Sequence, residues 1–230
     1  MPIFVDKLIH SYVSAQVEVV RNSLPQNVGA MCTQAFSQCR PPVVNAITAS
    51  KETSGGICHA LSAMWIKHHL QSNQSLGDWL CPSGRIDMDV LFVAETLQGV
   101  GIGIRRKTGL VGDNQDSLTD DWLKQFGIVE DGIFSDIDFV NESDLANRIV
   151  STTGGENRLI AIGGKLAAHT MAANATAGGG VLFFDPNYGE FQFPDSPTFT
   201  NWFAQQFWPK SKYSLVMTGS YRVTKYRVAA

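Results

Sequence analysis

The helical and the strand-like stretches of this 230-residue sequence are segregated along the chain. Apolar residues recur at helical spacing through much of the first 150 residues, whereas the last third holds short apolar or alternating runs separated by glycines. Alternating strands and helices are typical of doubly wound parallel sheets, and segregated elements are typical of α+β folds. The sequence therefore predicts an α+β protein, with a helical N-terminal half packed against a C-terminal antiparallel sheet.

Individual elements are expected from apolar periodicity and from glycine and proline breakers. Residues 25–54 contain Pro41-Pro42 and many small polar side chains, which indicates a loop with room for a short strand, and residues 107–116 are expected to form a second loop. Helices are expected over residues 4–23, 58–70, 87–98, 118–126, 143–150 and 198–208. Strands are expected over residues 99–104, 158–164, 167–173, 181–185, 188–193 and 213–227.

Composition and charge argue against several classes of function. The net charge is −3 and no basic block is present, so nucleic acid is not an expected partner. No apolar run approaches the roughly 20 residues that span a bilayer, and the first residues lack the pattern of a cleaved secretory signal. The acidic clusters at 87–89 and 113–116 lack the pattern of a calcium loop, and we expect no metal and no cofactor.

Cys58 lies where two glycines lead into an apolar helix-forming stretch. This placement puts a thiol at a helix N-terminus, where backbone N–H groups and the helix dipole favour the thiolate. A thiolate is a strong nucleophile near neutral pH. The four cysteines include no C-x-x-C pair, and we expect all of them to be reduced.

Two further polar residues stand in strand-like segments, where an isolated polar side chain is costly unless it is paired. His169 follows Cys58 by 111 residues (169 − 58), and Asp185 follows His169 by 16 (185 − 169). A thiol hydrolase needs a sulfur, a histidine to pair with it and a group to orient the histidine. Taken singly, Cys58 could be a packed apolar residue, His169 a hydrogen-bonded strand residue, and Asp185 before Pro186 the start of a turn.

Three segments carry a resemblance to a known family. Residues 55–62 (GGICHALS), 168–172 (AHTMA) and 183–191 (FFDPNYGEF) are together similar to the YopT/AvrPphB family of bacterial effector cysteine proteases, over roughly residues 50–225. The resemblance implies a papain-like fold and a Cys-His-Asp triad in this order. By this resemblance Cys58 is the nucleophile, His169 is the general base and then acid, and Asp185 orients the imidazole.

The source of the oxyanion donors is left open by the sequence. Papain-like enzymes carry an amide side chain five or six positions before the cysteine, where this chain has Thr53 and Glu52. The Thr53 hydroxyl can donate a hydrogen bond and ionised Glu52 cannot, so the expected donors are the Cys58 backbone N–H and, more weakly, Thr53. Asn187 is a second choice to orient His169.

We therefore expect one papain-like domain over residues 1–230, in which residues 1–50 form an N-terminal helix and loop extension and residues 51–227 the catalytic core. The resemblance implies a bacterial virulence effector or toxin, secreted without a cleaved signal peptide from the cytoplasm of the producing cell. It would cleave a host protein in the host cytosol, and small GTPases and kinases are substrates of relatives. We expect a monomer without stable membrane insertion.

Two alternatives stay open. The same triad could deamidate glutamine or transfer an acyl group, as a transglutaminase does. The chain could instead be an inactive interaction module in which Cys58 only packs.

Overall fold

The computed structural model describes residues 2–108, 113–138, 140–150, 156–164 and 167–229. Within these residues the helices are α1 (Pro2–Arg21), α2 (Val43–Ile47), α3 (Cys58–Ser72), α4 (Leu76–Trp79), α5 (Met88–Thr108), α6 (Asp113–Lys124), α7 (Glu142–Val150), α8 (Ser196–Trp202), α9 (Trp208–Lys210) and α10 (Tyr213–Val216), with a π-helical turn over Phe203–Phe207 and 3-10 turns over Gln26–Val28 and Pro82–Gly84. The strands are β1 (Met31–Gln34), β2 (Ile128–Ile137), β3 (Glu156–Gly163), β4 (Ala168–Ala175), β5 (Val181–Asp185), β6 (Gly189–Phe193) and β7 (Ser220–Val228).

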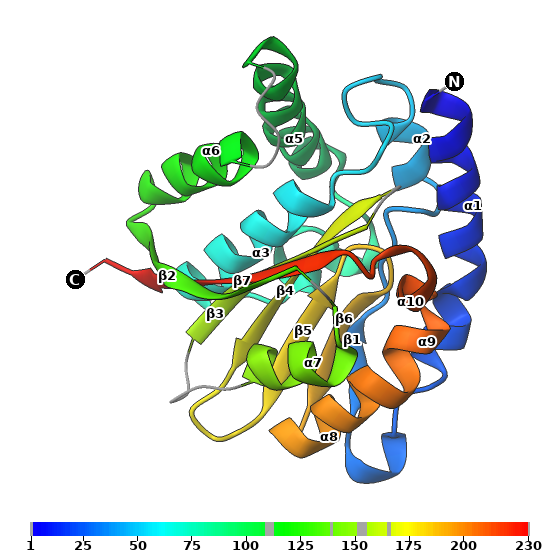
Figure 1. Cartoon of the computed structure of the whole chain (residues 1–230), viewed down its shortest axis with the longest axis vertical. Helices are drawn as coiled ribbons and strands as arrows, with labels where there is room; N and C mark the ends of the chain where they lie inside the picture. Colours follow the sequence, from blue (N-terminus) through cyan, green and yellow to red (C-terminus); the bar gives the residue numbers. More distant parts are fainter. Residues whose placement is uncertain (1, 109–112, 139, 151–155, 165–166, 230) are drawn as a thin grey trace.

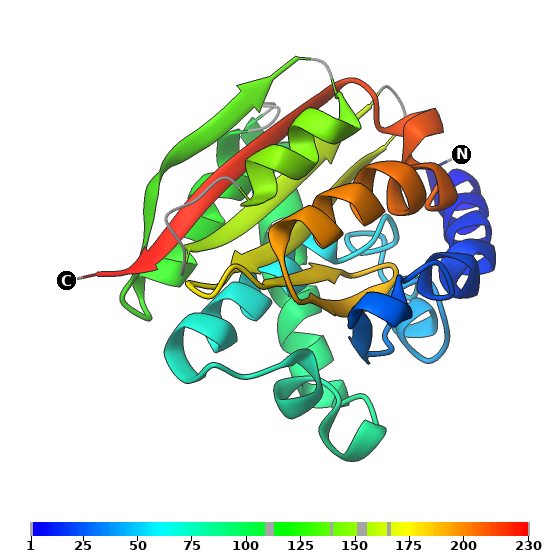
Figure 2. The same ribbon diagram turned by 90° about the horizontal axis from the view of Figure 1, so that it is seen from below.

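The seven strands of the described residues form one antiparallel sheet in the order β1-β6-β5-β4-β3-β7-β2. Helices α3, α5 and α6 lie on one side of this sheet, and α7, α8 and α9 lie on the other (Figure 1). Figure 2 shows α7 and the α8–α9 segment over the near face of the sheet, with α1 at the side. The segregation expected from the sequence is confirmed, although β1 and β2 come from outside the C-terminal strand block.

The two faces of the sheet bury alternate residues of each strand, as a pleated strand requires. Phe183 on β5 packs in the core beneath α7 and α8, whereas its neighbour Phe184 packs in the core around α3. Helix α3 is buried almost all round from His59 to Ile66, so it runs through the interior against β3, β4 and β5. A helix that is apolar on most sides is expected to be central in this way.

An aromatic cluster holds β5 in place at the end where Asp185 follows. The Phe183 ring lies within 6.3 Å, between ring centroids, of its aromatic neighbours Phe191, Phe199, Trp202, Phe203 and Phe207. Each buried phenylalanine contributes about 1.5–3 kcal/mol of hydrophobic free energy. The strand that ends at Asp185 is therefore rigidly anchored.

Glu190 joins four elements from within the core. Only 1% of its surface is exposed. Its carboxylate accepts hydrogen bonds from the Trp65 indole at 2.6 Å, the Leu76 backbone N–H at 3.0 Å and the Thr33 hydroxyl at 2.8 Å. Because a buried carboxylate is costly unless it is fully bonded, this set of donors fixes β6 against α3, α4 and β1.

Three expectations about the elements were wrong. Residues 99–104 continue helix α5 and form no strand, because extending an existing helix costs less than starting a new element. Strand β2 was not expected: its sequence is acidic and its pairing with β7 is broken by two register shifts. Residues 213–216 form α10, and the last strand begins only at Ser220. Part of the expected loop at 107–116 lies outside the described residues, and its ends belong to α5 and α6.

Candidate active site

Cys58 is the first residue of α3 and faces a cavity. The chain enters this helix through Gly56, whose φ of +117° is a conformation that disfavours a side chain, and a Cβ there would lie 3.3 Å from Gln38 Oε1. The N–H groups of a first helical turn have no acceptor within the helix. The local sequence Gly-Gly-Ile-Cys thus presents a thiol at the N-terminus of a helix.

His169 and Asp185 reach the same place from neighbouring antiparallel strands. His169 is the second residue of β4 and Asp185 is the last residue of β5, and both are buried. The His169 Nε2 atom lies 2.9 Å from Asp185 Oδ1. The Asn187 backbone N–H donates to the same oxygen at 2.7 Å, and the Tyr213 hydroxyl donates to Oδ2 at 3.0 Å.

The Cys58 and His169 side chains line the same cavity, and His169 is near enough to act on the pKa of the Cys58 thiol. Because Nε2 of His169 is occupied by Asp185, the nitrogen that faces the sulfur is Nδ1. Burial opposes ionisation of the thiol, but the charge and hydrogen bond of His169 and a bond from the Thr170 backbone outweigh it, so the pKa of Cys58 is lowered. Burial likewise opposes the imidazolium, yet the charges of Asp185 and Cys58 raise the pKa of His169 to about 10. Both shifts favour a thiolate–imidazolium pair.

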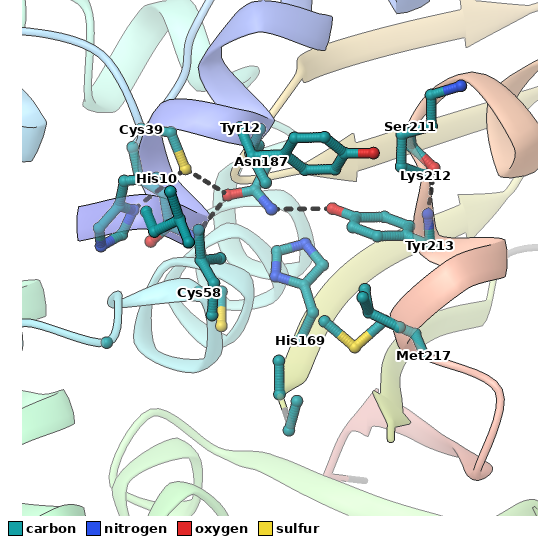
Figure 3. A pocket seen from close by; sticks show the side chains of 18 residues that line it. His10, Tyr12, Cys39, Cys58, His169, Asn187, Ser211, Lys212, Tyr213 and Met217 are labelled. Carbon is teal, nitrogen blue, oxygen red and sulfur yellow. Dashed lines mark hydrogen bonds between the residues drawn. The ribbon is translucent and has the colours of Figure 1, made fainter. Parts of the chain in front are cut away.

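The cavity in front of this pair has a volume of about 570 Å³ (Figure 3). One wall comes from α1, through Leu8, Tyr12 and Val13 among others, and the opposite wall comes from α10 and the residue after it, through Val216 and Met217. The lining is mainly apolar. A cleft of this size can hold several residues of an extended polypeptide next to Cys58.

Comparison with known proteins gives the family. The model of Peptidase_C58, described as Yersinia/Haemophilus virulence surface antigen, matches residues 21–228. The chain belongs to this family. It is 35% identical over 224 residues to the cysteine protease yopT1 of Yersinia enterocolitica serotype O:8, covering 90% of this chain and 66% of that protein. It is 28% identical over 220 residues to the protein adenylyltransferase and cysteine protease IbpA of Histophilus somni, covering 88% of this chain and 5% of IbpA.

Among solved structures, the Pseudomonas avirulence protein AvrPphB aligns with a TM-score of 0.56 at 13% identity, over 78% of this chain and 95% of that one. At this identity the likeness shows the fold alone. The α+β, papain-like architecture expected from the sequence is therefore confirmed for this Peptidase_C58 member.

The expected side-chain oxyanion donor, Thr53, lies elsewhere in this family member. Its hydroxyl donates to the Ile47 carbonyl at 2.7 Å, the residue is 3% exposed, and it does not line the cavity. The cavity is lined instead by Gln38, from the loop between β1 and α2. Gln38 stands 20 residues before Cys58 (58 − 38), so no local spacing in the sequence could indicate it.

Asn187, the second choice to orient His169, has a different set of contacts. Its Oδ1 accepts from Gln38 Nε2 at 2.8 Å, and its Nδ2 donates to the Tyr213 hydroxyl at 2.8 Å. In Figure 3 the Asn187 amide lies above the His169 ring, between Cys39 and Tyr213. Asp185 is the residue that contacts His169 Nε2. Tyr213 was not singled out from the sequence, since only the folded chain brings α10 to the end of β5.

The remaining histidines of the nucleophile's helix lie outside the cavity. His59 Nε2 is 2.7 Å from the Thr119 hydroxyl, and burial lowers the pKa of His59 to about 4. His68 and His69 stack on Trp79 and Trp65. In the described part of the chain no cluster of His, Cys, Asp and Glu is arranged to hold a metal ion, and no described helix is both long and apolar enough to cross a bilayer.

Proposed function

We propose that this chain is a cysteine endopeptidase in which Cys58 is the nucleophile, His169 the base and then the acid, and Asp185 the residue that orients His169. Membership of a family whose curated relatives are named cysteine proteases supports the reaction class. The observation that carries the residue assignment is that Cys58 and His169 line the same cleft, with His169 Nε2 2.9 Å from Asp185 Oδ1.

The reaction follows from the positions of these groups. His169 holds the proton of Cys58, and the thiolate sulfur attacks the scissile carbonyl carbon to give a tetrahedral oxyanion. When this intermediate collapses, the C–N bond breaks, the leaving amine takes the proton from His169, and a thioester to Cys58 remains. A water molecule then gives a proton to His169 and attacks the thioester, which releases the carboxylic acid and restores the thiol.

The oxyanion requires donors next to the sulfur. We assign the Cys58 backbone N–H and Gln38 Nε2–H to this role in place of Thr53. Gln38 Oε1 accepts the Ile57 N–H at 2.8 Å, which fixes the orientation of the amide. Its Nε2 carries two hydrogens, and one of them is used by Asn187. Among the described residues the second has no protein acceptor, and Gln38 lines the same cavity as Cys58. The catalytic machinery of the proposed single domain thus extends into the first 50 residues.

The biological setting is proposed from the family. Its members include virulence proteins, and this chain spans 66% of the length of the Yersinia proteases. We propose that the protein is secreted and acts on a host protein in the host cytosol, as a monomer. The cleft is mainly apolar, and Lys212 is the lysine among its described lining residues.

The deciding experiment compares host-cell lysate treated with the wild type, with Cys58→Ala and with Cys32→Ala. Cys32 is a half-buried cysteine that does not line the cleft, so its variant is the matched control. New protein N-termini that appear with the wild type and Cys32→Ala, and not with Cys58→Ala, are expected. If the targets stay intact and gain about one dalton at a glutamine, the protein is a deamidase and not a protease. No covalent change in any protein, together with slow alkylation of Cys58, would favour the inactive module.

A further inference from the structure

A chain of four hydrogen bonds joins the residue before the nucleophile to Asp185. The Ile57 backbone N–H donates to Gln38 Oε1 at 2.8 Å, and Gln38 Nε2 donates to Asn187 Oδ1 at 2.8 Å. Asn187 Nδ2 donates to the Tyr213 hydroxyl at 2.8 Å, and that hydroxyl donates to Asp185 Oδ2 at 3.0 Å. The chain therefore ends on the carboxylate oxygen that His169 does not use.

The direction of this chain is set at its first bond. A backbone N–H can only donate, so the Gln38 oxygen faces Ile57 and the Gln38 nitrogen faces Asn187. Asn187 then receives at its oxygen and donates from its nitrogen. The Tyr213 oxygen accepts this bond, and its single proton is directed to Asp185. Successive bonds in one direction polarise each other, which makes the phenol a stronger donor.

Tyr213 is well placed for this task. It is 2% exposed, and its ring centroid lies 5.2 Å from that of His169. Burial, followed by the nearby charge of Asp185, raises the pKa of Tyr213 well above its ordinary value, so the phenol keeps its proton through the working pH range.

We propose that Tyr213 is a positioning residue of this active site, which holds Oδ2 of Asp185 and thereby sets how strongly Asp185 acts on His169. The inference rests on the proposed function. The Tyr213 hydroxyl draws electron density from the carboxylate. Without it, the buried Oδ2 loses its donor among the described residues, while Oδ1 keeps the bonds from His169 and the Asn187 backbone. The carboxylate charge then acts more fully on the imidazolium.

The test measures the rate at which iodoacetamide alkylates Cys58 from pH 5 to pH 11, in wild type and in Tyr213→Phe. Mass spectrometry gives the extent of alkylation at each pH. The rate changes at the pH where His169 loses its proton, because a thiolate paired with an imidazolium reacts differently from a free thiolate. In Tyr213→Phe this alkaline step is expected at higher pH, by about 0.3–1 unit. The kcat for a cleaved protein is expected to fall about tenfold, with KM within about threefold.

Tyr188→Phe is the matched control. Tyr188 is as deeply buried, and its ring centroid is 5.8 Å from that of Tyr213, but its hydroxyl donates to the Ser211 carbonyl and not to Asp185. It is expected to leave the alkaline step in place. Asn187→Ala is a second variant, which weakens the Tyr213 hydroxyl as a donor without removing it. In this variant the alkaline step is expected to move to higher pH by less than it does in Tyr213→Phe. Thermal unfolding confirms that each variant is folded.

The outcomes separate the two proposals. An alkaline step in Tyr213→Phe that is unmoved, that falls to lower pH, or that moves no further than in Tyr188→Phe overturns the role of Tyr213. A wild-type Cys58 that alkylates slowly, with the pH profile of an ordinary thiol, overturns the proposed function instead.

Discussion

Two pairs of a thiol and an imidazole line the same cleft, and only one of them has the features of a catalytic pair. His169 lowers the pKa of Cys58, and Cys39 Sγ lies 3.3 Å from His10 Nδ1. In each histidine the other ring nitrogen is also occupied. The type of residue alone therefore does not distinguish the two pairs.

The difference lies behind the imidazole. His10 Nε2 is 2.8 Å from the Ser54 carbonyl, a neutral acceptor, whereas His169 Nε2 faces the Asp185 carboxylate. Burial and the negative charges of Asp185 and Cys58 raise the pKa of Cys39, whereas the charge of His169 lowers that of Cys58. A nearby imidazole is thus insufficient to activate a thiol, and a carboxylate that stabilises the imidazolium supplies the missing free energy.

The largest effect is expected when the two cysteines are substituted one at a time. Cys58→Ala is expected to reduce kcat/KM by about 10⁴-fold or more, because the bond-forming atom is lost. Cys39→Ala is expected to reduce it by no more than about fivefold, since it removes only part of the cleft wall and the contacts of Cys39 with Asn187 and His10. Cleavage of the identified host substrate measures both. Similar losses in the two variants would contradict the distinction.

The second largest effect is expected from a substitution that removes the negative charge next to His169. Asp185→Asn is expected to lower kcat by about 10³–10⁴-fold, as loss of the orienting carboxylate does in other triads. The pKa of His169 falls in this variant, because the Asp185 charge raises it. Cys58 then loses the imidazolium charge that lowers the pKa of the thiol, and this loss is expected to exceed the small gain from removing the negative charge of Asp185. Alkylation of Cys58 at pH 6.5 should slow accordingly. Unchanged alkylation would show that Asp185 does not control the pair.

A third prediction concerns selectivity in the wild type. At pH 6.5, limiting iodoacetamide is expected to modify Cys58 about 100-fold faster than Cys39. Cys58 is expected to react faster because its lowered pKa keeps the thiolate present below the pH range of an ordinary thiol. The raised pKa of Cys39 keeps that thiol protonated at the same pH. Peptide mapping by mass spectrometry measures both rates. Equal alkylation rates would show that Cys58 is no more activated than Cys39.

The smallest expected effect falls on His10. His10→Ala removes the donor to the Ser54 carbonyl and is expected to lower the free energy of unfolding by about 1–2 kcal/mol, measured by urea denaturation. The kcat/KM is expected to change less than tenfold, whereas His169→Ala should abolish turnover. A loss of activity in His10→Ala as large as that in His169→Ala would make His10 part of the catalytic machinery.

The sequence predicted those parts of the fold that depend on local pattern. The apolar run after Cys58 indicated α3, and the glycine-separated apolar runs indicated β3, β4 and β5. Strand β2 was missed because edge pairing with β7 tolerates an acidic sequence that carries no alternation.

The candidate site was predictable to the same extent. Cys58, His169 and Asp185 stood out by order, setting and family resemblance. In the structure Cys58 and His169 line one cavity, and His169 Nε2 lies 2.9 Å from Asp185 Oδ1. Gln38 and Tyr213 could not be found in this way. Their contacts with Asn187 span 149 and 26 residues of sequence, and such pairings exist only in the folded chain.

The order of the site residues along the sequence has a consequence for biosynthesis. A nascent polypeptide that ends before β5 already contains Cys58 and His169, but it has no Asp185 to charge the imidazole and no α10 to close the cleft. Such a fragment lacks the carboxylate that raises the pKa of His169, so its thiol is expected to behave as an ordinary one until β5 and α10 have been made. The cell that makes this protein therefore encounters the reactive sulfur only after the segment from α3 to α10 has been synthesised and has folded.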